Sequence, residues 1–231
     1  ITGANGLIAS NIVDTLMYFN WRYDMIYIFD FDGTLVDSME IFSRSMVRIL
    51  DENNILYPDN IVEILTPLGY KGTADYAIGL GLKMSADEFI RKATEYNINE
   101  YSYHIPAKSF VKETLIRLKN GGNSLNVLTA SPHTMLDVCL KRLDMYDLFD
   151  NVWSCDDFGL TKDNCEIYLN AARRLNTSVE KCCFIDDNIN AVSAAKKAGM
   201  TAIGIYDRSS DTLVDRMKKI SDRYIYDFRE L

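Results

Sequence analysis

The chain lacks any long apolar run. No stretch of its 231 residues comes near the ~18 to 20 uninterrupted apolar residues that a membrane helix needs. Its first residues also lack the basic start and the apolar block of a secretion signal. The sequence therefore predicts neither a membrane helix nor export, and we expect a cytoplasmic location.

Cysteine and histidine are scarce and poorly spaced for metal or redox chemistry. The five cysteines are odd in number and have no C-x-x-C spacing, which disfavours a disulfide framework or a zinc site. We expect them to be small buried apolar residues. His104 and His133 are the two histidines. Ser131 and His133 could form a nucleophile pair, but no acidic motif supports them, so we expect ordinary surface or loop histidines.

Positive charge is in deficit. The formal net charge of −8 argues against nucleic acid as a partner, because nucleic-acid binding requires a basic surface. The electrostatic field of this net negative charge would also repel an anionic substrate. A site for such a substrate must therefore supply local positive charge from a metal, a lysine or backbone amides.

From residue 25 onward the chain alternates short apolar runs with amphipathic ones. The first pattern is typical of strands and the second of helices. Their alternation predicts an α/β fold with a parallel sheet flanked by helices. We expect strands at Met25-Asp30, Leu125-Thr129, Val152-Cys155, Cys182-Ile185, Thr201-Tyr206 and Tyr224-Tyr226, and helices at about 107–119, 133–143, 163–174, 188–198 and 210–220.

The stretch between the first two strands differs, because helical patterns follow one another without a convincing strand. They predict a small all-helical insert after the first strand. We expect residues 1–22 to form a separate leading segment, 23–37 and 105–231 the core, and 38–104 the insert. The helical patterns are Met39-Leu50, Asn60-Leu68, Ala74-Leu80 and Ala86-Tyr96.

The first predicted strand ends in two carboxylates, Asp30 and Asp32. Side chains at i and i+2 of an extended segment point the same way. They would meet at the carboxyl end of the strand, where open α/β sheets bind ligands. Two close carboxylates repel each other unless a cation lies between them, and Mg²⁺ is a hard ion that prefers oxygen ligands. The pattern is compatible with a magnesium site or with an ordinary polar turn.

Two helix starts carry capping patterns. Asp37 or Ser38 is expected to cap the helix after the first strand, with Glu40 completing a capping box. Ser131 and Pro132 are expected to be the cap and the first residue of the helix after the second strand. Backbone amides at that second start would offer an anion site.

The run Asp30-Phe31-Asp32-Gly33-Thr34-Leu35-Val36-Asp37-Ser38 resembles the first motif of the haloacid dehalogenase (HAD) superfamily, whose members mostly cleave phosphate esters. In that family the first Asp attacks phosphorus and becomes an aspartyl phosphate, while the second acts as general acid and base. The resemblance implies these roles for Asp30 and Asp32, a share of both in Mg²⁺ binding, and a place for Gly33 beside the substrate.

Leu125-Asn126-Val127-Leu128-Thr129 resembles the second motif of this family. The resemblance implies that the Thr129 hydroxyl, with Ala130 and Ser131 beside it, holds a phosphate oxygen. Lys162 corresponds to the third motif, in which a lysine neutralises the nucleophile and the transferring phosphoryl group. Many relatives have prolines directly after this lysine, whereas Asp163 and Asn164 follow here. This departure leaves open how rigid the loop is and whether Lys162 pairs with Asp163.

Cys183-Phe184-Ile185-Asp186-Asp187-Asn188 resembles the fourth motif, in which paired acids bind or orient Mg²⁺. The resemblance implies that Asp187 is a direct ligand and that Asp186 is a ligand or supports one. The four motifs occur in the family's order over roughly residues 25–226.

The predicted insert matches the position of the family's helical cap, which closes over the site. Within it, the run Leu68-Gly69-Tyr70-Lys71-Gly72-Thr73 is the expected contact loop, with Tyr70 and Lys71 facing substrate. The same run is compatible with a turn at a helix end and a solvated lysine. β-Phosphoglucomutases carry a histidine ten residues after the second Asp and an arginine in the cap loop. Phe42 stands at the first position and no arginine at the second, which favours hydrolysis.

The segment Ile1-Thr2-Gly3-Ala4-Asn5-Gly6-Leu7-Ile8-Ala9-Ser10-Asn11 resembles the nucleotide-binding start of an NAD-dependent epimerase. In that interpretation Asp30 would bind a ribose hydroxyl. The glycines have no strand before them, and no Tyr-x-x-x-Lys pair with the rest of an epimerase domain follows. We therefore expect residues 1–22 to be a truncated remnant without cofactor, whether a natural fusion, a fragment or an artefact.

The resemblance to the HAD superfamily thus implies a Mg²⁺-dependent hydrolase of a small phosphorylated metabolite. We expect a monomer or weak dimer that binds neither nucleic acid nor membrane. Three alternatives stay open: phosphoryl transfer as in β-phosphoglucomutase, binding of a phosphorylated ligand without turnover, and an NAD-binding epimerase fragment.

Overall fold

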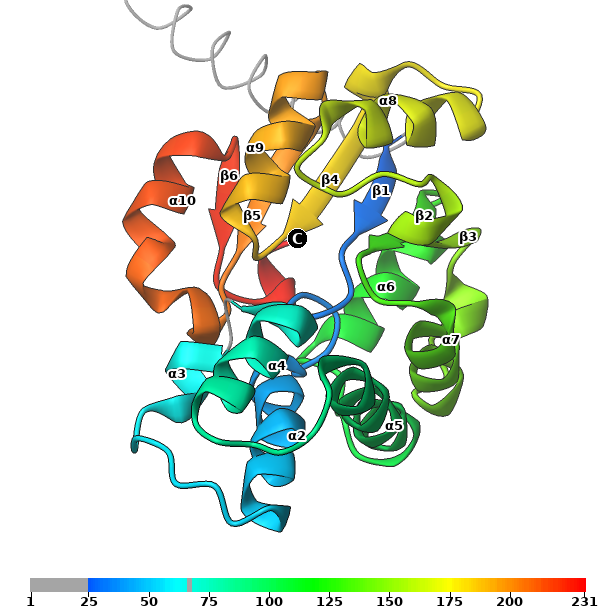
Figure 1. Cartoon of the computed structure of the whole chain (residues 1–231). Helices are drawn as coiled ribbons and strands as arrows, with labels where there is room; N and C mark the ends of the chain where they lie inside the picture. Colours follow the sequence, from blue (N-terminus) through cyan, green and yellow to red (C-terminus); the bar gives the residue numbers. More distant parts are fainter. Residues whose placement is uncertain (1–24, 66–67) are drawn as a thin grey trace, which may run out of the picture.

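A six-stranded sheet forms the centre of the molecule. The computed structural model describes residues 25–65 and 68–231, so the prediction for residues 1–22 lies outside the described residues. The strand order is β3-β2-β1-β4-β5-β6 and every pairing is parallel, which confirms the predicted fold class (Figure 1). The strands are β1 Ile26–Phe29, β2 Ser124–Thr129, β3 Asn151–Ser154, β4 Cys182–Asp186, β5 Thr201–Ile205 and β6 Arg223–Ile225.

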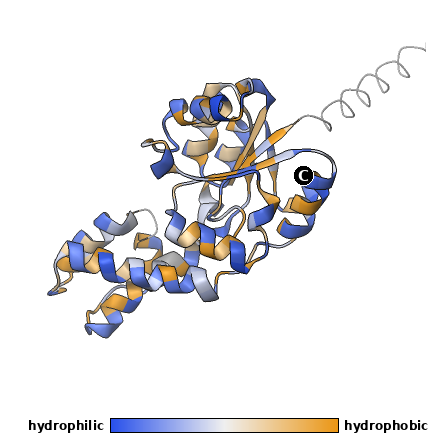
Figure 2. Cartoon of the chain, turned by 90° about the vertical axis from the view of Figure 1, so that its right-hand side faces the viewer, coloured by the Kyte–Doolittle hydropathy of each residue, from blue (hydrophilic) through white to orange (hydrophobic). Residues whose placement is uncertain are grey.

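Apolar side chains cover both faces of the sheet. Neighbouring residues of a strand point to opposite faces, so Phe29 joins one buried cluster and Ile28 the other. In Figure 2 the strands carry the apolar colour of this core. Burial on both faces explains why the strands read as continuous apolar runs rather than as alternating ones.

Helices cover each face of the sheet. Buried residues of α6 and α7 pack into the cluster that contains Phe29, and those of α8, α9 and α10 into the cluster that contains Ile28. The helices are α6 Val111–Asn120, α7 His133–Arg142, α8 Cys165–Arg174, α9 Ile189–Ala198 and α10 Val214–Ile220, with short 3-10 helices at η1 Tyr146–Leu148, η2 Cys155–Asp157, η3 Val179–Lys181, η4 Arg208–Leu213 and η5 Phe228–Glu230.

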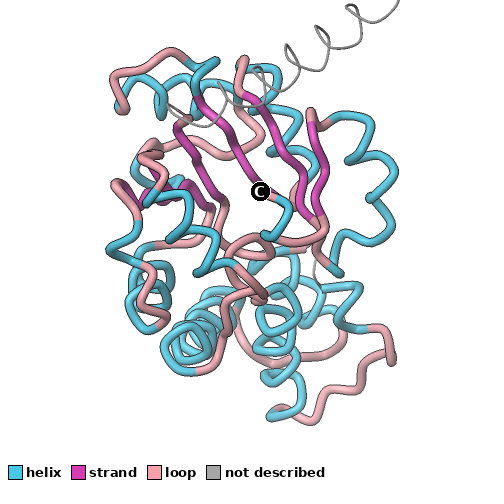
Figure 3. The backbone as a smooth tube through the Cα atoms, turned by 180° about the vertical axis from the view of Figure 1, so that it is seen from behind, coloured by secondary structure: helices cyan, strands magenta, loops and turns pink. Residues whose placement is uncertain are grey.

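A helical cap lies between β1 and β2 in sequence and beyond the carboxyl ends of the strands in space (Figures 1 and 3). It has its own buried cluster, which includes Met46, Leu50 and Phe89. This confirms an all-helical cap after the first strand, while the exact residues predicted to divide cap from core stay a prediction. The cap helices are α2 Met39–Glu52, α3 Ile61–Leu65, α4 Gly69–Gly79 and α5 Ala86–Tyr103.

The two segments that join cap and core run side by side. The amide of Asp37 donates to the carbonyl of Pro106 over 3.0 Å, and the amide of Lys108 donates to the carbonyl of Leu35 over 3.0 Å. Between these two hydrogen bonds, Val36 of the outgoing segment and Ala107 of the returning segment form an antiparallel bridge. The chain therefore leaves the core and returns to it at neighbouring points.

Two details of the cap differ from the sequence prediction. The run expected to be a loop from Leu68 to Thr73 is instead the start of α4, which begins at Gly69. Gly69 has a φ of +61°, which lets the chain turn into the helix, so this glycine starts a helix rather than a loop. Helix α5 also runs to Tyr103, beyond the predicted end at Tyr96, because Asn97 and Tyr101 on one of its faces are buried.

Within the described ranges, no helix combines the length and the apolar character needed to cross a membrane. All five cysteines lie in the described residues and are free; four of them are buried, and Cys165 is partly exposed.

Candidate active site

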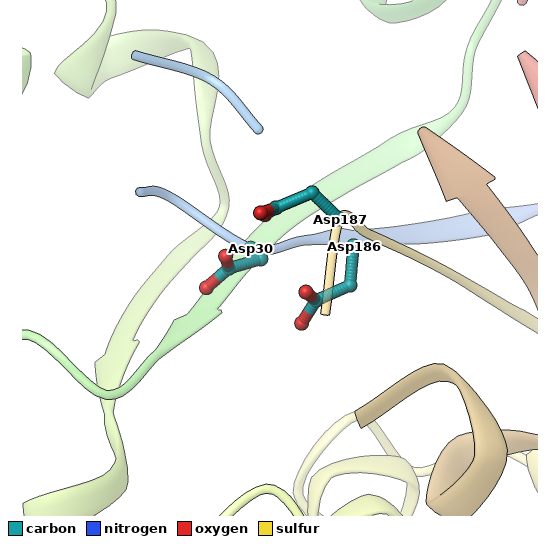
Figure 4. A group of neighbouring side chains, drawn as sticks. All are labelled: Asp30, Asp186 and Asp187. Carbon is teal, nitrogen blue, oxygen red and sulfur yellow. The ribbon is translucent and has the colours of Figure 1, made fainter. Parts of the chain in front are cut away.

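The sheet brings the predicted acidic motifs to one edge. In the register of β1 and β4, Phe29 lies opposite Ile185, and the amide of Asp30 donates to the carbonyl of Ile185 over 2.9 Å. Asp30 therefore lies next to Asp186 and Asp187, at the carboxyl ends of two adjacent strands. Figure 4 shows the three carboxylates gathered there.

These three carboxylates form a buried cluster. One oxygen from each of Asp30, Asp186 and Asp187 lies within 4.8 Å of the others, and their exposed fractions are 3%, 0% and 5%. Burial, followed by repulsion from Asp186, raises the pKa of Asp30 to about 7 and that of Asp187 well above its usual range. Burial likewise raises the pKa of Asp186. Such a set of oxygen donors is unfavourable alone and fits a hard divalent cation.

We expect the protein without metal to lose stability as the pH rises from about 4 to above 7. The folded chain raises the pKa of Asp30 from 3.8 to about 7, so it holds a proton that the unfolded chain releases in this range. The stabilisation from this retained proton is fully present below the unfolded Asp30 pKa of 3.8, and it is lost as the pH rises through the folded pKa of about 7. Thermal unfolding with and without MgCl₂ should show a larger metal-induced rise in Tm at about pH 8 than at about pH 5. Equal rises at both pH values would contradict the expectation.

Lys162 supplies positive charge at the cluster. Its Nζ donates to Asp30 Oδ1 over 2.5 Å and to Asp186 Oδ2 over 2.8 Å, and its side chain is 13% exposed. Burial alone would lower the pKa of Lys162, but the carboxylates of Asp186 and Asp30 raise it well above its usual range. The lysine therefore stays charged and lies where an anionic substrate would need a cation.

Side-chain hydrogen bonds hold the loop that carries Lys162. The Tyr168 hydroxyl donates to the Lys162 carbonyl over 2.7 Å and is also 3.1 Å from the Ala191 carbonyl. Asp163, whose pairing with Lys162 the sequence left open, instead accepts from the Thr161 hydroxyl. Asn164 caps α8 by accepting from the Glu166 amide. These side-chain hydrogen bonds therefore order the loop.

The turn after β1 fixes Asp187. Thr34 Oγ1 donates to Asp187 Oδ1 over 3.1 Å, and the Asp187 amide donates back to Thr34 Oγ1 over 3.2 Å. Gly33 has a φ of +72°, and a Cβ at this position would lie 2.6 Å from Asp187 Oδ2. Only glycine fits both the conformation and the space. Lys108 Nζ holds the same turn by donating to the Gly33 carbonyl over 2.6 Å.

The segment after β2 lies on the other side of β1. Thr129 is buried, and its Oγ1 accepts from the Ser131 amide over 3.1 Å. Ala130 is exposed at the end of the strand. Helix α7 begins at His133 with Pro132 as its N-cap, so the predicted start was wrong by one residue. Ser131 does not cap this helix, because its hydroxyl donates to Asp32.

Asp32 lies beside the carboxylate cluster but is not part of it. Its Oδ1 accepts from the Ser38 hydroxyl over 2.6 Å and from the Tyr101 hydroxyl, and its Oδ2 accepts from the Ser131 hydroxyl. The expected capping box at α2 was wrong, because Ser38 is the N-cap but makes no side-chain capping bond. Its hydroxyl serves Asp32 instead. Neither Ser38 nor Tyr101 was predicted to contact this residue.

The two cap residues predicted to face substrate differ in their surroundings. Tyr70 is half-buried, packs against both the cap cluster and the core cluster, and accepts from Asn97 Nδ2 over 2.9 Å. Lys71 is exposed. Both lie in the first turn of α4 rather than in a loop. Tyr70 is therefore placed at the boundary between cap and core, and their substrate contacts stay a prediction.

His133 has two carboxylate partners that the sequence did not predict. Its Nδ1 lies 2.9 Å from Asp137 Oδ1 and its Nε2 lies 2.9 Å from Asp157 Oδ2. With both ring nitrogens bonded to carboxylates, the ring offers no nitrogen to accept the Ser131 proton. A Ser131–His133 nucleophile pair is therefore disfavoured by geometry as well as by sequence.

The family model described as haloacid dehalogenase-like hydrolase matches residues 27–205. The chain belongs to this family and is therefore a hydrolase of the HAD superfamily.

Named relatives agree with this class. The phosphorylated carbohydrates phosphatase of Thermotoga maritima is 28% identical over 177 residues, which cover 76% of this chain and 82% of the relative. The pyrophosphatase PpaX of Bacillus velezensis is 27% identical over 179 residues, covering 77% and 81%. A HAD family hydrolase from Deinococcus radiodurans, crystallised with phosphate and sodium, superposes with a TM-score of 0.72 at 23% identity and covers 90% of this chain and 93% of its own.

Proposed function

We propose that this hydrolase is a phosphatase that hydrolyses a small phosphorylated metabolite, a phosphomonoester, with Mg²⁺ and through an aspartyl-phosphate intermediate on Asp30. The observation that carries the proposal is the buried set of three carboxylates with Lys162 bonded to Asp30 and Asp186. An enzyme of negative net charge needs local positive charge to accept a phosphate ester, and here Lys162 together with a cation bound to these carboxylates would supply it.

The proposed metal ligands are the carboxylates of Asp30 and Asp187, with Asp186 in support. Asp186 already uses Oδ2 for Lys162 and Oδ1 for the Asn188 amide, which donates over 2.6 Å, and this suits a supporting role. We propose no carboxylate contact from Asp32, which faces three hydroxyl groups. Bound Mg²⁺ would neutralise charge between the nucleophile and the phosphoryl oxygens.

In the first step a carboxylate oxygen of Asp30 attacks phosphorus and the ester P–O bond breaks. Asp32, in its protonated form, gives its proton to the leaving oxygen. Lys162 holds the carboxylate of Asp30 and faces the negative charge of the transferring phosphoryl group. Thr129, Ala130, Ser131 and the turn at Gly33 are proposed to surround the phosphoryl oxygens.

In the second step water attacks the aspartyl phosphate and gives a proton to Asp32. The P–O bond to Asp30 breaks, inorganic phosphate leaves, and both aspartates return to their starting forms. The cap, through Tyr70 and Lys71 among others, is proposed to select the organic part of the substrate. A cytoplasmic location and a monomer or weak dimer stay predictions.

The alternatives have less support. Phosphoryl transfer as in β-phosphoglucomutase is less well supported, because this sequence lacks the histidine and the arginine that those enzymes carry. A ribose site at Asp30 is disfavoured, because this carboxylate is buried among two other acids and a lysine. Binding without turnover is the remaining rival, and activity measurements separate it from hydrolysis.

The test is phosphate release by the purified protein from 4-nitrophenyl phosphate and from a panel of sugar, polyol and glycolate phosphates. We expect release with MgCl₂ and its loss with excess EDTA, because the carboxylate cluster needs a cation to accept a second anion. Restoration by added Mg²⁺ is the matched control for chelator damage. Absence of phosphate release from every ester of the panel would favour binding without turnover. Full activity in EDTA would contradict the metal requirement.

A further inference from the structure

Tyr101 connects the cap to the carboxylate of Asp32. It lies in α5, the last cap helix before the chain returns to the core, and only 2% of its surface is exposed. Its hydroxyl donates to Asp32 Oδ1, across 69 positions of sequence. A side chain of the cap thus reaches the group proposed as general acid and base.

The three donors to Asp32 come from three separate parts of the chain. Ser38 lies at the start of α2, Tyr101 near the end of α5, and Ser131 in the segment after β2. A carboxylate has about four acceptor positions on its two oxygens. Oδ1 uses two of them for Ser38 and Tyr101, and Oδ2 uses one for Ser131. The position left over is on Oδ2, so these bonds also decide which oxygen is presented to a reactant.

Tyr101 is itself held firmly between cap and core. Its ring lies against Phe31, with ring centroids 5.9 Å apart, and its carbonyl accepts from Arg142 Nε of α7 over 3.3 Å. Arg142 also donates to the carbonyl of Ile105 at the return to the core. Burial, followed by the nearby charge of Asp32, raises the pKa of Tyr101 well above its usual range, so the phenol stays a donor.

We infer that Tyr101 is a positioning residue that ties the orientation of the Asp32 carboxylate to the seating of the cap on the core. The inference rests on the proposed function. When α5 is seated, the hydroxyl fixes Oδ1 and turns Oδ2 towards the reacting atoms. Movement of α5 away from the core removes this donor and leaves Asp32 with its two serine partners. The acid and base group is then aligned only in the closed site, where bulk water is excluded.

Tyr101→Phe tests this inference, because it removes one hydroxyl and keeps the ring on Phe31. The measurement is kcat/KM for an alkyl phosphate, whose leaving oxygen needs a proton, and for 4-nitrophenyl phosphate, whose leaving group does not. We expect a loss of about tenfold or more for the alkyl ester and less than about threefold for the aryl ester. Tyr103→Phe, an exposed tyrosine of the same helix, is the matched control and should match wild type on both esters.

A double-mutant cycle with Asp32→Asn separates positioning from general packing. If Tyr101 acts through Asp32, adding Tyr101→Phe to Asp32→Asn should change kcat/KM no further. Thermal unfolding of each variant shows that it is folded. Additive losses, or equal losses on both esters, would overturn the inference and leave Tyr101 as a packing residue. Wild-type protein that is inactive on every ester would overturn the proposed function, and this inference with it, whereas an active wild type with an unchanged Tyr101→Phe overturns the inference alone.

Discussion

Asp30→Asn is expected to lower kcat for 4-nitrophenyl phosphate by a factor on the order of 10³ or more. The amide oxygen is a poor nucleophile towards phosphorus, and the substitution removes the attacking group while keeping its size. The same change takes one negative charge out of a buried acidic cluster. We therefore expect the metal-free variant to be at least as stable as wild type near pH 8, where Asp30 is otherwise ionised.

The two expected effects of Asp30→Asn separate loss of the nucleophile from loss of the fold, since activity falls while the stability of the metal-free protein does not. Kinetics on the aryl ester and thermal unfolding in EDTA measure the two effects. Asp59→Asn, at an exposed position of the cap, is the matched control and should leave both unchanged. An Asp30→Asn protein with wild-type activity would refute Asp30 as the nucleophile.

Lys162→Met is expected to reduce both activity and stability. It leaves Asp30 and Asp186 buried together without the cation that now lies between them. Breaking a buried ion pair on one side costs about 3 kcal/mol or more of unfolding free energy, and loss of charge at the phosphoryl group should lower kcat/KM by about 10²-fold or more. The loss of stability should shrink at low pH, where the carboxyl groups take up protons, and on addition of Mg²⁺.

Denaturant unfolding at about pH 5 and about pH 8, with kinetics at the higher pH, measures these effects. Lys181→Met, which removes an exposed lysine just before β4, is the matched control. A Lys162→Met protein with wild-type stability at the higher pH would show that the lysine does not balance the cluster.

The sheet and the positions of the acidic motifs could be predicted because their signals are local. Apolar runs predicted both ends of every strand of the sheet to within one residue. Asp30 and Asp186 could be placed at strand ends because they directly follow or close such runs. The pairing of neighbours in the sheet then brings them together. None of this requires knowledge of contacts between distant segments.

The partners of the site could not be predicted, because their contacts join distant parts of the chain. Tyr101 and Lys108 approach the turn after β1 from 69 and 75 positions away, and no spacing in the sequence signals such a contact. Thr34 is part of the first motif, but its bonds to Asp187 depend on how β1 and β4 pair. The error at Gly69 had a different cause, since a glycine with positive φ can begin a helix as well as end one.

The paired connections between cap and core have an evolutionary consequence. Because a backbone hydrogen bond joins Leu35 and Lys108, the chain segment between them begins and ends at one point of the core. A different insert could be spliced in at this point without breaking a strand or changing the order of the sheet. Substrate preference can thus diversify by exchange of a module, while Asp30, Lys162 and the acids at the end of β4 keep their places at the sheet. Ser38 and Tyr101, which lie within the exchanged segment, would be replaced together with it.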